Sequence, residues 1–503
     1  MLRLRQEKDV DTLRQAAVLL ERENQKLTQK IVELTRELMA LKGQAPEQLT
    51  MKIAELEQQL AARTKALFGD STEKRAHEKV PKRKAVQHGH GPRPQPDLPL
   101  IEVVHTLDAE PPVCSDCGKP VEPWKDQFED SEEVDVITRQ FVLKKHRRQK
   151  YRCECCKCIV TAPAPLKLVE GGRYSIDFAV HVAISKYLDH LPLERQVRIM
   201  RREGLLVDSQ TLWDQVDALA GLLRSSHARL LGYILGKSVI GADETWWRLM
   251  GEKGKCEGGA GKRWQVWAAC ADDAVCYNLE DSRSAAAGEN LLGGYDGVAM
   301  CDGYSVYDAL AKKNGNLKLA HCWSHVRRKF VEIEEFFPEQ AGKAISMIGE
   351  LFAIDAVCPT GPPGDEMRHN LRQERARPVV ARIREWAMSV QALPESGLRK
   401  AIAYMIGMWK GLTRFLDDPK IPLHNNATER ALRGIVVGRK NHYGSRSKRG
   451  TEAAAVLYSL VESAKLAGVD PHRYLREAVH AALRGQQIPL PHELAAAAIS
   501  TAA

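Results

Sequence analysis

Between residues 237 and 330 the chain carries a succession of short apolar segments that few folds accommodate. Three strand-like segments follow one another with short turns between them: SVIGADETWWRL, RWQVWAACAD and DAVCYNLED. A helical segment, SAAAGENLLGG, comes next, and then two strands that each run into a helix, GVAMCDGYSVYDAL and LKLAHCWSHVRRKF. Apolar runs bounded by turn residues favour strands, and apolar residues every three or four positions favour helices. We therefore expect three antiparallel strands, a helix, a strand, a helix and a further strand.

This order of elements is typical of ribonuclease-H-like domains. We predict such an α/β catalytic domain over residues 237–470, with a helical insertion at about 331–420 that a Pro/Gly-rich stretch interrupts at 359–364. The chain has 503 residues, and single cores rarely grow beyond roughly 250–300 residues. We therefore expect a multidomain α+β protein, in which 471–503 is a C-terminal tail.

Carboxylates stand where two of the predicted strands end. Asp243 ends the apolar run that begins at Val239, and Asp302 ends the run that begins at Val298. Glu429 opens a helix after the turn HNNAT. In-line cleavage of a phosphodiester uses two metal ions about 4 Å apart, and magnesium prefers oxygen ligands. The three carboxylates are therefore candidate ligands for two Mg²⁺ or Mn²⁺ ions, with strand-end turn formers as the alternative.

Half of the twelve cysteines gather in one short region: Cys114, Cys117, Cys153, Cys155, Cys156 and Cys158. Cys114 and Cys117 form a CxxC knuckle. The second knuckle pairs Cys153 with Cys156, or else Cys155 with Cys158, and the strand-like run FVLKKHRRQKY before Cys153 favours the first choice. Four thiolates suit a structural, tetrahedral Zn²⁺. We expect a zinc ribbon over 100–162.

The N-terminal segment, residues 1–68, reads as a leucine zipper. Leucine, valine, isoleucine and alanine recur at spacings of three and four from Val10 to Leu41, which is a coiled-coil seam. Asn24 occupies an a position, where a buried amide favours a parallel dimer in one register. We expect a homo-oligomer, with a helix packed on the chain's own body as the alternative. Residues 69–99, rich in Pro, Gly and basic side chains, read as a flexible basic linker.

Residues 163–236 are predicted to be helical and to bind DNA. The stretch LPLERQVRIMRREGLLVDSQTLWDQVDAL indicates helix, short turn and helix, with Gly204 ending the first helix and Ser209 as N-cap of the second. This makes a helix-turn-helix-like segment, which is a candidate for reading DNA. An ordinary two-helix hairpin is the alternative.

Charge and composition place the protein in a compartment. The net charge is +9, with 44% hydrophobic and 28% charged residues, which is typical of a folded soluble protein. The N-terminus MLRLRQEKDVD lacks the apolar core of a signal peptide, and no stretch of about 20 apolar residues is present. We expect a cytoplasmic, nucleoid-associated protein that keeps its thiols reduced.

Five blocks of sequence resemble one family: GADET, MCDGY, HCWSHVRRKF, LHNNATERALRGIVVGRKNHYGS and LVESAKLAGVDP. They are similar to the transposases of the bacterial IS-sixty-six insertion-sequence group, and the similarity covers nearly the whole chain. The resemblance implies a DDE-type enzyme with its acidic triad at Asp243, Asp302 and Glu429. It implies zinc ligands at Cys114, Cys117, Cys153 and Cys156. Accessory proteins encoded by the same element are further partners that it implies.

Basic side chains concentrate around these features. A basic run lies between the knuckles, at Lys144, Lys145, Arg147, Arg148, Lys150 and Arg152. Between Arg430 and Thr451 stand seven basic residues and no acidic one: Arg430, Arg433, Arg439, Lys440, Arg446, Lys448 and Arg449. We predict that these, with His325, Arg327 and Arg328, hold DNA phosphates. A solvated basic face is the alternative.

Other residues near the triad receive structural roles. Glu244 adjoins Asp243, and since side chains alternate along a strand, only one of the two faces the metals. We expect Asp308 to be a surface group, Cys322 and Trp323 to pack at a strand end, and the tryptophans at 246, 247, 264 and 267 to belong to the core.

The sequence therefore predicts a DNA transposase that binds the ends of an insertion sequence, hydrolyses strands there and joins the 3′-hydroxyl ends to target DNA. Two alternatives stay open. One is a metal-dependent nuclease of the same fold without strand transfer. The other is a non-catalytic DNA-binding repressor derived from a transposase.

Overall fold

The structure is a computed structural model that describes residues 140–152, 158–251, 255–256 and 259–502, together with the single residues Gln29, Glu33 and Lys119. The predicted zipper and basic linker lie outside the described residues, apart from Gln29 and Glu33. The predicted zinc ligands Cys114, Cys117, Cys153 and Cys156 also lie outside them.

A short antiparallel hairpin opens the described part of the chain. It pairs β1 (Lys150–Arg152) with β2 (Ile159–Thr161). β1 ends at the residue before Cys153, so a strand does run up to the second knuckle, but it is only three residues long, and residues 141–149 of the predicted run are not in a strand.

The helical segment contains α3 (Ile176–Tyr187), α4 (Leu193–Arg202), α5 (Ser209–Leu222) and α6 (Arg224–Leu235). The predicted helix–turn–helix pair is thus α4 and α5, and Gly204 in the turn adopts a positive φ of 86°, which glycine tolerates without strain. The N-cap prediction was wrong by one residue. The Asp208 side chain caps α5 by accepting from the Thr211 amide at 2.6 Å, while Ser209 Oγ donates to Glu194 at 2.6 Å.

A five-stranded mixed sheet forms the centre of the fold. Its strands are β3 (Val239–Leu249), β6 (Lys262–Cys270), β7 (Val275–Glu280), β8 (Val298–Cys301) and β9 (Lys318–His321). They lie in the order β7-β6-β3-β8-β9, antiparallel through β7, β6 and β3 and parallel through β3, β8 and β9. Helices α7 (Ala285–Leu292) and α8 (Ser305–Lys313) precede and follow β8, and α9 (Trp323–Val331) follows β9. The predicted succession of strands and helices is therefore confirmed.

A further ribbon lengthens the β3–β6 hairpin. It consists of β4 (Lys255–Cys256) and β5 (Gly259–Ala260).

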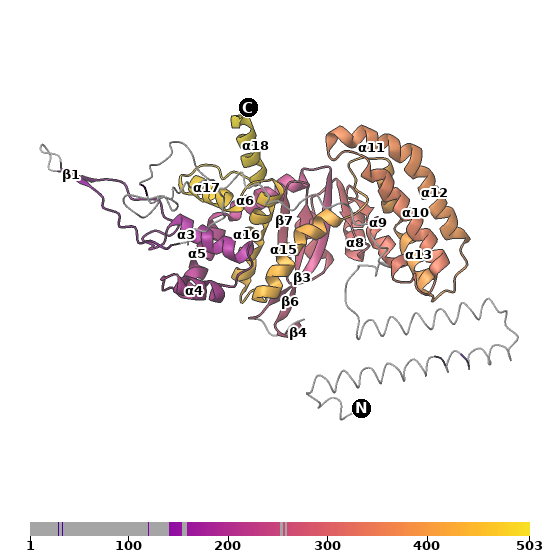
Figure 1. The fold of residues 1–503 in the computed structure, drawn as a ribbon, viewed down its shortest axis with the longest axis horizontal. Helices are drawn as coiled ribbons and strands as arrows, with labels where there is room; N and C mark the ends of the chain where they lie inside the picture. The colour runs from indigo at the N-terminus through magenta and orange to yellow at the C-terminus, as the bar shows by residue number, and fades with distance from the viewer. Residues whose placement is uncertain are drawn as a thin grey trace, which may run out of the picture. The chain divides into compact units, whose positions relative to one another are not determined.

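The helical insertion follows α9. It contains α10 (Pro338–Ala356), η1 (Pro362–Gly364), α11 (Asp365–Leu371), η2 (Arg372–Ala376), α12 (Arg377–Ser389), α13 (Gly397–Gly407), α14 (Trp409–Leu412) and η3 (Arg414–Leu416). These helices form a hydrophobic core that is separate from the main one, and Figure 1 shows them to one side of the sheet. The buried Arg372 pairs with Asp355 at 2.7 Å and donates to the carbonyl groups of Phe415, Asp418 and Ile421, which ties η2 to the end of the insertion.

The chain returns to the sheet through its last helices, α15 (Asn426–His442), α16 (Lys448–Leu466), α17 (Pro471–Leu483) and α18 (Pro491–Ala502). α16 is one continuous helix, and its residues 453–464 are all buried. An uninterrupted apolar run has no period to separate a buried strand from a buried helix. The isolated bridge between Leu249 and Ser445 is the β-structure that residues 421–470 contain.

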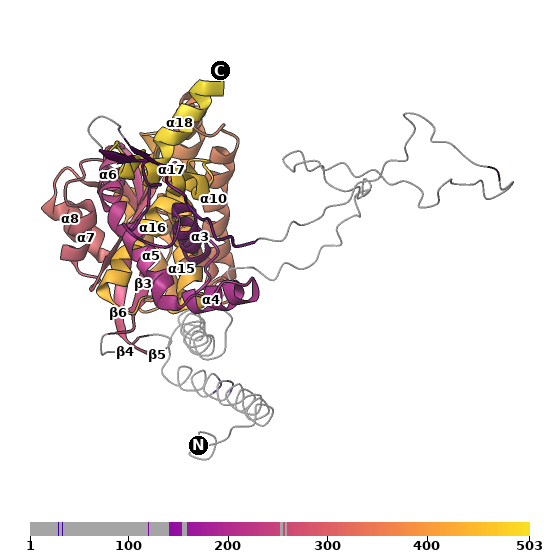
Figure 2. The same cartoon turned by 90° about the vertical axis from the view of Figure 1, so that its left-hand side faces the viewer.

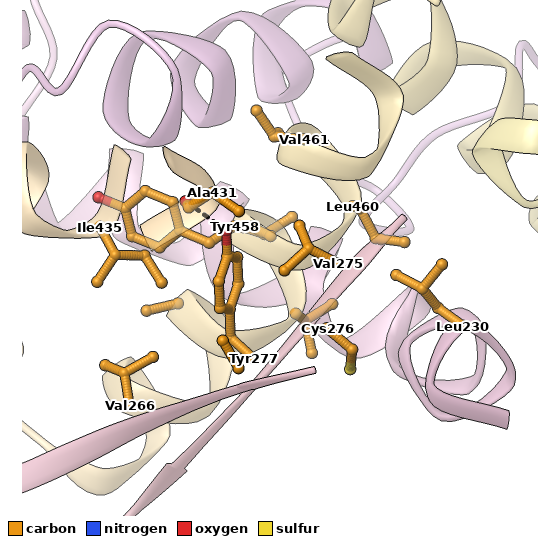
Figure 3. Packing of buried hydrophobic residues seen from close by; sticks show 14 of the residues in the cluster. Leu230, Val266, Val275, Cys276, Tyr277, Ala431, Ile435, Tyr458, Leu460 and Val461 are labelled. Atoms are coloured by element: carbon orange, nitrogen blue, oxygen red, sulfur yellow. Dashed lines mark hydrogen bonds between the residues drawn. The ribbon is translucent and has the colours of Figure 1, made fainter. Parts of the chain in front are cut away.

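One face of the sheet packs against α15 and α16. Figure 3 shows Val266 and Tyr277 from the strands beside Ile435 of α15 and Tyr458 of α16. The buried Tyr277 hydroxyl donates to the Ala431 carbonyl at 2.7 Å, so a polar group is satisfied inside this layer. Each such large side chain contributes about 1.5–3 kcal/mol through burial. This packing fixes α15 against the strands.

Candidate active site

Asp243 lies in β3 on the face that α15 covers. Gly241, two residues earlier and therefore on the same face, lies so close to α15 that a Cβ atom there would stand 1.9 Å from the Thr428 hydroxyl. The Asn425 side chain donates from Nδ2 to the Ala242 carbonyl at 2.9 Å. The strand that carries Asp243 is thus in direct contact with the start of α15.

Asp302 is the first residue after β8, the parallel neighbour of β3. Because Gly241 pairs with Met300, Asp243 and Asp302 stand at equivalent positions two residues further on. The Asp302 carboxylate accepts from the Tyr304 amide at 3.0 Å, which fixes the turn into α8. The prediction of a carboxylate at a strand end holds for Asp302, but it was wrong for Asp243, because β3 continues to Leu249. The two carboxylates nevertheless lie on neighbouring strands, as predicted.

Glu429 is in the first turn of α15. The buried Asn425 organises the turn before it. Its backbone N–H donates to the Cys322 sulfur at 3.3 Å. Its side-chain oxygen accepts from the Thr428 hydroxyl at 2.7 Å. The expectation that asparagine shapes the turn presenting Glu429 therefore holds for Asn425.

The three carboxylates share one electrostatic environment. Burial raises the pKa of the Asp243 carboxyl to about 7, and the negative charges of Glu244, Asp302 and Glu429 add to the shift. Oε1 of Glu429 is buried and accepts no hydrogen bond. Gathering partly buried acids costs free energy, and a bound cation would offset that cost.

The described residues contain no group of three or more His, Cys, Asp or Glu side chains already placed to hold one metal ion. Local donors occupy two of the carboxylates instead, since Asp243 accepts from the Glu244 amide at 2.8 Å and Asp302 from Tyr304. The donor set nevertheless fits a hard cation, because it consists of carboxylate oxygens and includes Oε1 of Glu429, which accepts no hydrogen bond.

Glu244 is held on the opposite face of the sheet. Its nearly inaccessible carboxylate pairs with Arg283 and accepts from the Tyr307 hydroxyl of α8 at 2.7 Å. Asp308 is exposed on α8. Of the adjacent acids, Asp243 alone faces α15, as strand alternation predicted.

His325 of α9 stands beside Glu429, with its Nε2 atom 3.7 Å from Oε1 of the carboxylate. A hydrogen bond with the Cys322 thiol raises the pKa of His325, and the charge of Glu429 adds to the effect. Cys322 and Trp323 are fully buried, as expected for residues at a strand end. The His325 ring therefore faces the carboxylates, where it would hold Glu429 in place.

Sequence patterns missed one residue at this site, Tyr404 of α13. Gly303, directly after Asp302, lies against it, because a Cβ atom on Gly303 would come within 3.1 Å of the Tyr404 hydroxyl. Burial raises the pKa of Tyr404 to about 12, with the Asp302 charge adding to it. An isolated tyrosine in an amphipathic helix gives no signal of such a contact. The insertion thus supplies a side chain to the turn that carries Asp302.

The sequence matches one protein-family model over residues 171–453, that of the Transposase IS66 family. This chain belongs to that family. The match covers β3, β8 and all of α15, and therefore all three carboxylates.

Relatives of similar length support the assignment. The uncharacterized protein y4jD of Sinorhizobium fredii (strain NBRC 101917 / NGR234) is 31% identical over 406 residues, which is 77% of this chain and 78% of that protein. The uncharacterized protein y4qI of the same organism is 32% identical over 391 residues, 73% of this chain and 70% of its own length.

Solved structures give a weaker comparison. A pre-cleavage Mos1 transpososome aligns with 49% of this chain and 79% of its own at 12% identity, with a TM-score of 0.13. The Mos1 strand transfer complex gives 13% identity and the same TM-score over 49% and 78% of the two chains. Scores this low establish no common fold, so the architecture of this IS66-family chain rests on its own strand order.

The predicted DNA-binding residues of this IS66-family member divide by exposure. Arg430, Arg433 and Lys440 are exposed on α15, and all the basic residues of the run from Lys144 to Arg152 are exposed too. Arg439, by contrast, is buried, with its guanidinium stacked 3.7 Å from the centroid of the Trp246 ring and donating to Thr245 and to the Trp246 carbonyl. Its positive charge therefore interacts with groups inside the protein.

The remaining predicted residues lie near the core. Arg327 and Arg328 of α9 are half-buried. Trp247, Trp264 and Trp267 are buried, as expected for core residues. The expectation was wrong for Trp246, which is half-buried and carries the Arg439 guanidinium on its ring. No helix among the described residues is long and apolar enough to cross a membrane.

Proposed function

We propose that this protein is a DNA transposase whose ribonuclease-H-like domain cuts DNA at the ends of an insertion sequence and joins the freed ends to target DNA. The observation that carries the proposal is the juxtaposition of Asp243 and Asp302 at matched positions on two parallel strands, with the charge of Glu429 acting on Asp243. The sheet order and the family membership support the same conclusion.

Asp243, Asp302 and Glu429 would hold the divalent cations of this reaction, Mg²⁺ or Mn²⁺. Such ions activate a nucleophile and stabilise the charge that develops on the leaving oxygen. The protein's own task is positioning: the contact of Asn425 with Ala242 keeps the helix that carries Glu429 against the strand that carries Asp243. His325 keeps the Glu429 carboxylate turned toward the site.

The chemistry needs no external energy source. In the first step a water oxygen bonds to the phosphorus, the bond to the 3′ oxygen breaks, and that oxygen leaves as a hydroxyl with a proton. In the second step the oxygen of the freed 3′-hydroxyl bonds to a target phosphorus and gives up its proton, while the bond from that phosphorus to the target's 3′ oxygen breaks. The target oxygen leaves as a hydroxyl with a proton, so one phosphodiester replaces another. Arg430, Arg433 and Lys440, exposed on the helix that begins with Glu429, would hold the flanking phosphates.

The remaining modules are proposals from the sequence. A zipper in residues 1–68 would pair two subunits, and a Zn²⁺ ion on Cys114, Cys117, Cys153 and Cys156 would stabilise the domain at 100–162. Basic side chains from Lys144 to Arg152 would contact the element ends. The protein would act on the bacterial nucleoid in the cytoplasm, together with accessory proteins of the same element.

The test uses the full-length protein, Mg²⁺, duplexes that carry the DNA flanking its own gene, and a supercoiled target plasmid. We expect nicked ends with free 3′-hydroxyls and covalent joining to the plasmid. Asp302→Asn should retain DNA binding and lose both products, whereas Asp308→Asn, at an exposed acid of α8, should retain them. Normal cleavage by Asp302→Asn would refute the triad, and cleavage without joining would make the protein a nuclease.

A further inference from the structure

Helix α4 presents a row of arginines to solvent. Arg195, Arg198 and Arg202 follow one another at spacings of three and four, so they share one face of the helix, and Arg201 lies beside them. All of these side chains are exposed. The opposite side of the helix carries Gln196 and Met200, which are buried.

The charge of this row is not neutralised within the described part of the chain. None of these arginines pairs there with an acidic residue. The acid nearest to them on the helix, Glu194, accepts a hydrogen bond of 2.6 Å from Ser209 instead. A helix face that only interacts with water usually intersperses acids that pair with its bases at spacings of three or four. This face therefore keeps a net positive charge available to a partner.

The row is also held rigidly. The Gln196 side chain donates from Nε2 to the Val182 carbonyl at 3.3 Å and to the Leu191 carbonyl at 3.1 Å, which fixes α4 to the end of α3. A fixed helix lowers the entropy cost of binding an extended polyanion. Arginine, moreover, binds phosphate through two parallel N–H groups, which a lysine ammonium does not offer.

The following helix, α5, presents the opposite charge. Its N-cap Asp208 and Asp214 are exposed, and a third acid, Asp217, pairs with Arg449 at 3.2 Å. Acids along a helix repel the phosphates that border the major groove. In helix-turn-helix proteins the second helix lies in the major groove. The exposed acids of α5 do not suit that position, so the arginine-rich α4 is the better candidate for contact with DNA.

α4 and the proposed active site lie in connected parts of the fold, with α5, the start of α16 and the length of α15 between them. Arg449, at the start of α16, lies over Trp213 of α5 with 5.8 Å from its guanidinium carbon to the ring centroid, and α5 lies against α4 in both views (Figures 1 and 2). Between Arg449 and Glu429 runs α15, whose 17 residues span roughly 25 Å. α4 is therefore remote from the scissile phosphate and suited to the duplex that flanks it.

We propose that the arginine face of α4 binds the phosphate backbone of duplex DNA flanking the cleavage site, without reading base sequence. The proposal rests on the proposed transposase function, and it replaces groove reading by α5 with backbone contact by α4. Because each phosphate contact releases counterions, binding through this face depends steeply on salt.

The experiment measures binding of the full-length protein to fluorescent duplexes without added divalent metal, at several salt concentrations. The variant is Arg195→Gln/Arg198→Gln/Arg202→Gln. Its matched control, Arg375→Gln/Arg384→Gln/Arg399→Gln, changes exposed arginines of the insertion. We expect the α4 variant to lose at least roughly tenfold in affinity and about 2–3 from the log–log salt slope, on flanking and random duplexes alike. The control should bind as the wild type, and Arg→Lys changes at the α4 positions should restore most of the slope.

An α4 variant with the wild-type slope and an unchanged melting temperature would overturn the proposal. Loss of affinity on the flanking sequence alone would overturn it as well, since it would show base reading, and so would a preference for duplex RNA through the same arginines. Cleavage by the wild type is scored separately. A protein that binds through α4 but does not cut refutes only the transposase, and one that cuts while its α4 variants bind normally refutes only this inference.

Discussion

The Nδ2 atom of Asn425 donates a 2.9 Å hydrogen bond to the carbonyl oxygen of Ala242, the residue before Asp243. This contact joins two parts of the chain that are 183 positions apart. The same side chain accepts from Thr428, so one buried amide fixes both the strand and the helix that carry proposed metal ligands.

Asn425→Ala should lower the strand-cleavage rate by at least roughly tenfold, because a small misplacement of reacting groups costs rate steeply. It should also destabilise the fold by about 1–3 kcal/mol, since the Ala242 carbonyl loses its partner. Single-turnover cleavage and urea unfolding measure the two effects. Asn441→Ala, an exposed change near the other end of α15, is the control, and equal rates for both variants would contradict the positioning role.

Asp243→Asn and Glu244→Gln should have opposite profiles. The first removes an acid that its surroundings disfavour in charged form, so we expect stability to be kept or slightly raised and cleavage to be lost. The second removes the negative charge that pairs with Arg283 and that accepts a hydrogen bond from the Tyr307 hydroxyl. It should cost about 1–3 kcal/mol and leave the Mg²⁺ dependence of cleavage unchanged. Thermal unfolding with and without Mg²⁺ separates them, because only Asp243→Asn should abolish stabilisation by the metal. The reverse pattern would place the metal on the wrong face of the sheet.

Tyr404→Phe should reduce cleavage by roughly three- to tenfold, equivalent to about 1 kcal/mol, while changing stability little. The hydroxyl lies at the Asp302–Gly303 turn, so its removal loosens a turn that carries a proposed ligand and leaves the packed ring in place. Tyr443→Phe, which removes an exposed hydroxyl, serves as the comparison. Identical kinetics for the two variants would show that the insertion does not assist the site.

His442 should make the fold sensitive to acid. Its ring is buried, with Nδ1 3.2 Å from the Gly444 carbonyl and Nε2 3.0 Å from the Tyr458 hydroxyl. A carbonyl only accepts, so Nδ1 carries the proton and Nε2 accepts from Tyr458. Burial lowers the pKa of His442 to about 3, and the charge of Lys186 contributes.

In the unfolded chain this histidine takes up a proton near pH 6.5, whereas the folded protein takes it up only near pH 3. Protonation of the unfolded chain therefore costs the fold nothing above pH 6.5. Below it, the free energy of unfolding declines as the pH falls toward 3, by up to about 1.4 kcal/mol per pH unit. Urea unfolding at pH 7.5, 6 and 5 measures the decline. His442→Gln should flatten it and the exposed His146→Gln should not; parallel curves for all three proteins would rule out this origin.

The sheet and the two aspartates followed from the sequence because their signals are local. Each strand is a short apolar run bounded by turn residues, and Asp243 and Asp302 close two such runs. Alternation along β3 also separated Asp243 from Glu244 without any knowledge of the partners on either face. These inferences need only the period of the backbone and the direction of neighbouring strands.

Other features depend on contacts between distant segments, which local patterns do not encode. The basic run after Glu429 gave no sign that Arg439 folds back onto Trp246. The sequence did not reveal the extent of helix α16, because a helix buried on nearly every side has no polar face to mark its period. The sequence shows that α4 is basic and α5 acidic. Only the packing in the structure shows which of these side chains are exposed.

The long insertion has a consequence for when the protein acquires its activity. Glu429 follows Asp302 by 127 residues, which a ribosome adds in roughly 6–25 seconds at 5–20 residues per second. During that interval a nascent chain carries both strand aspartates and every basic segment that precedes the insertion, yet lacks the third proposed ligand. A translation product that stops inside the insertion would therefore lack Glu429 together with α15 and α16, whose side chains pack on the sheet, and it could not assemble the proposed site.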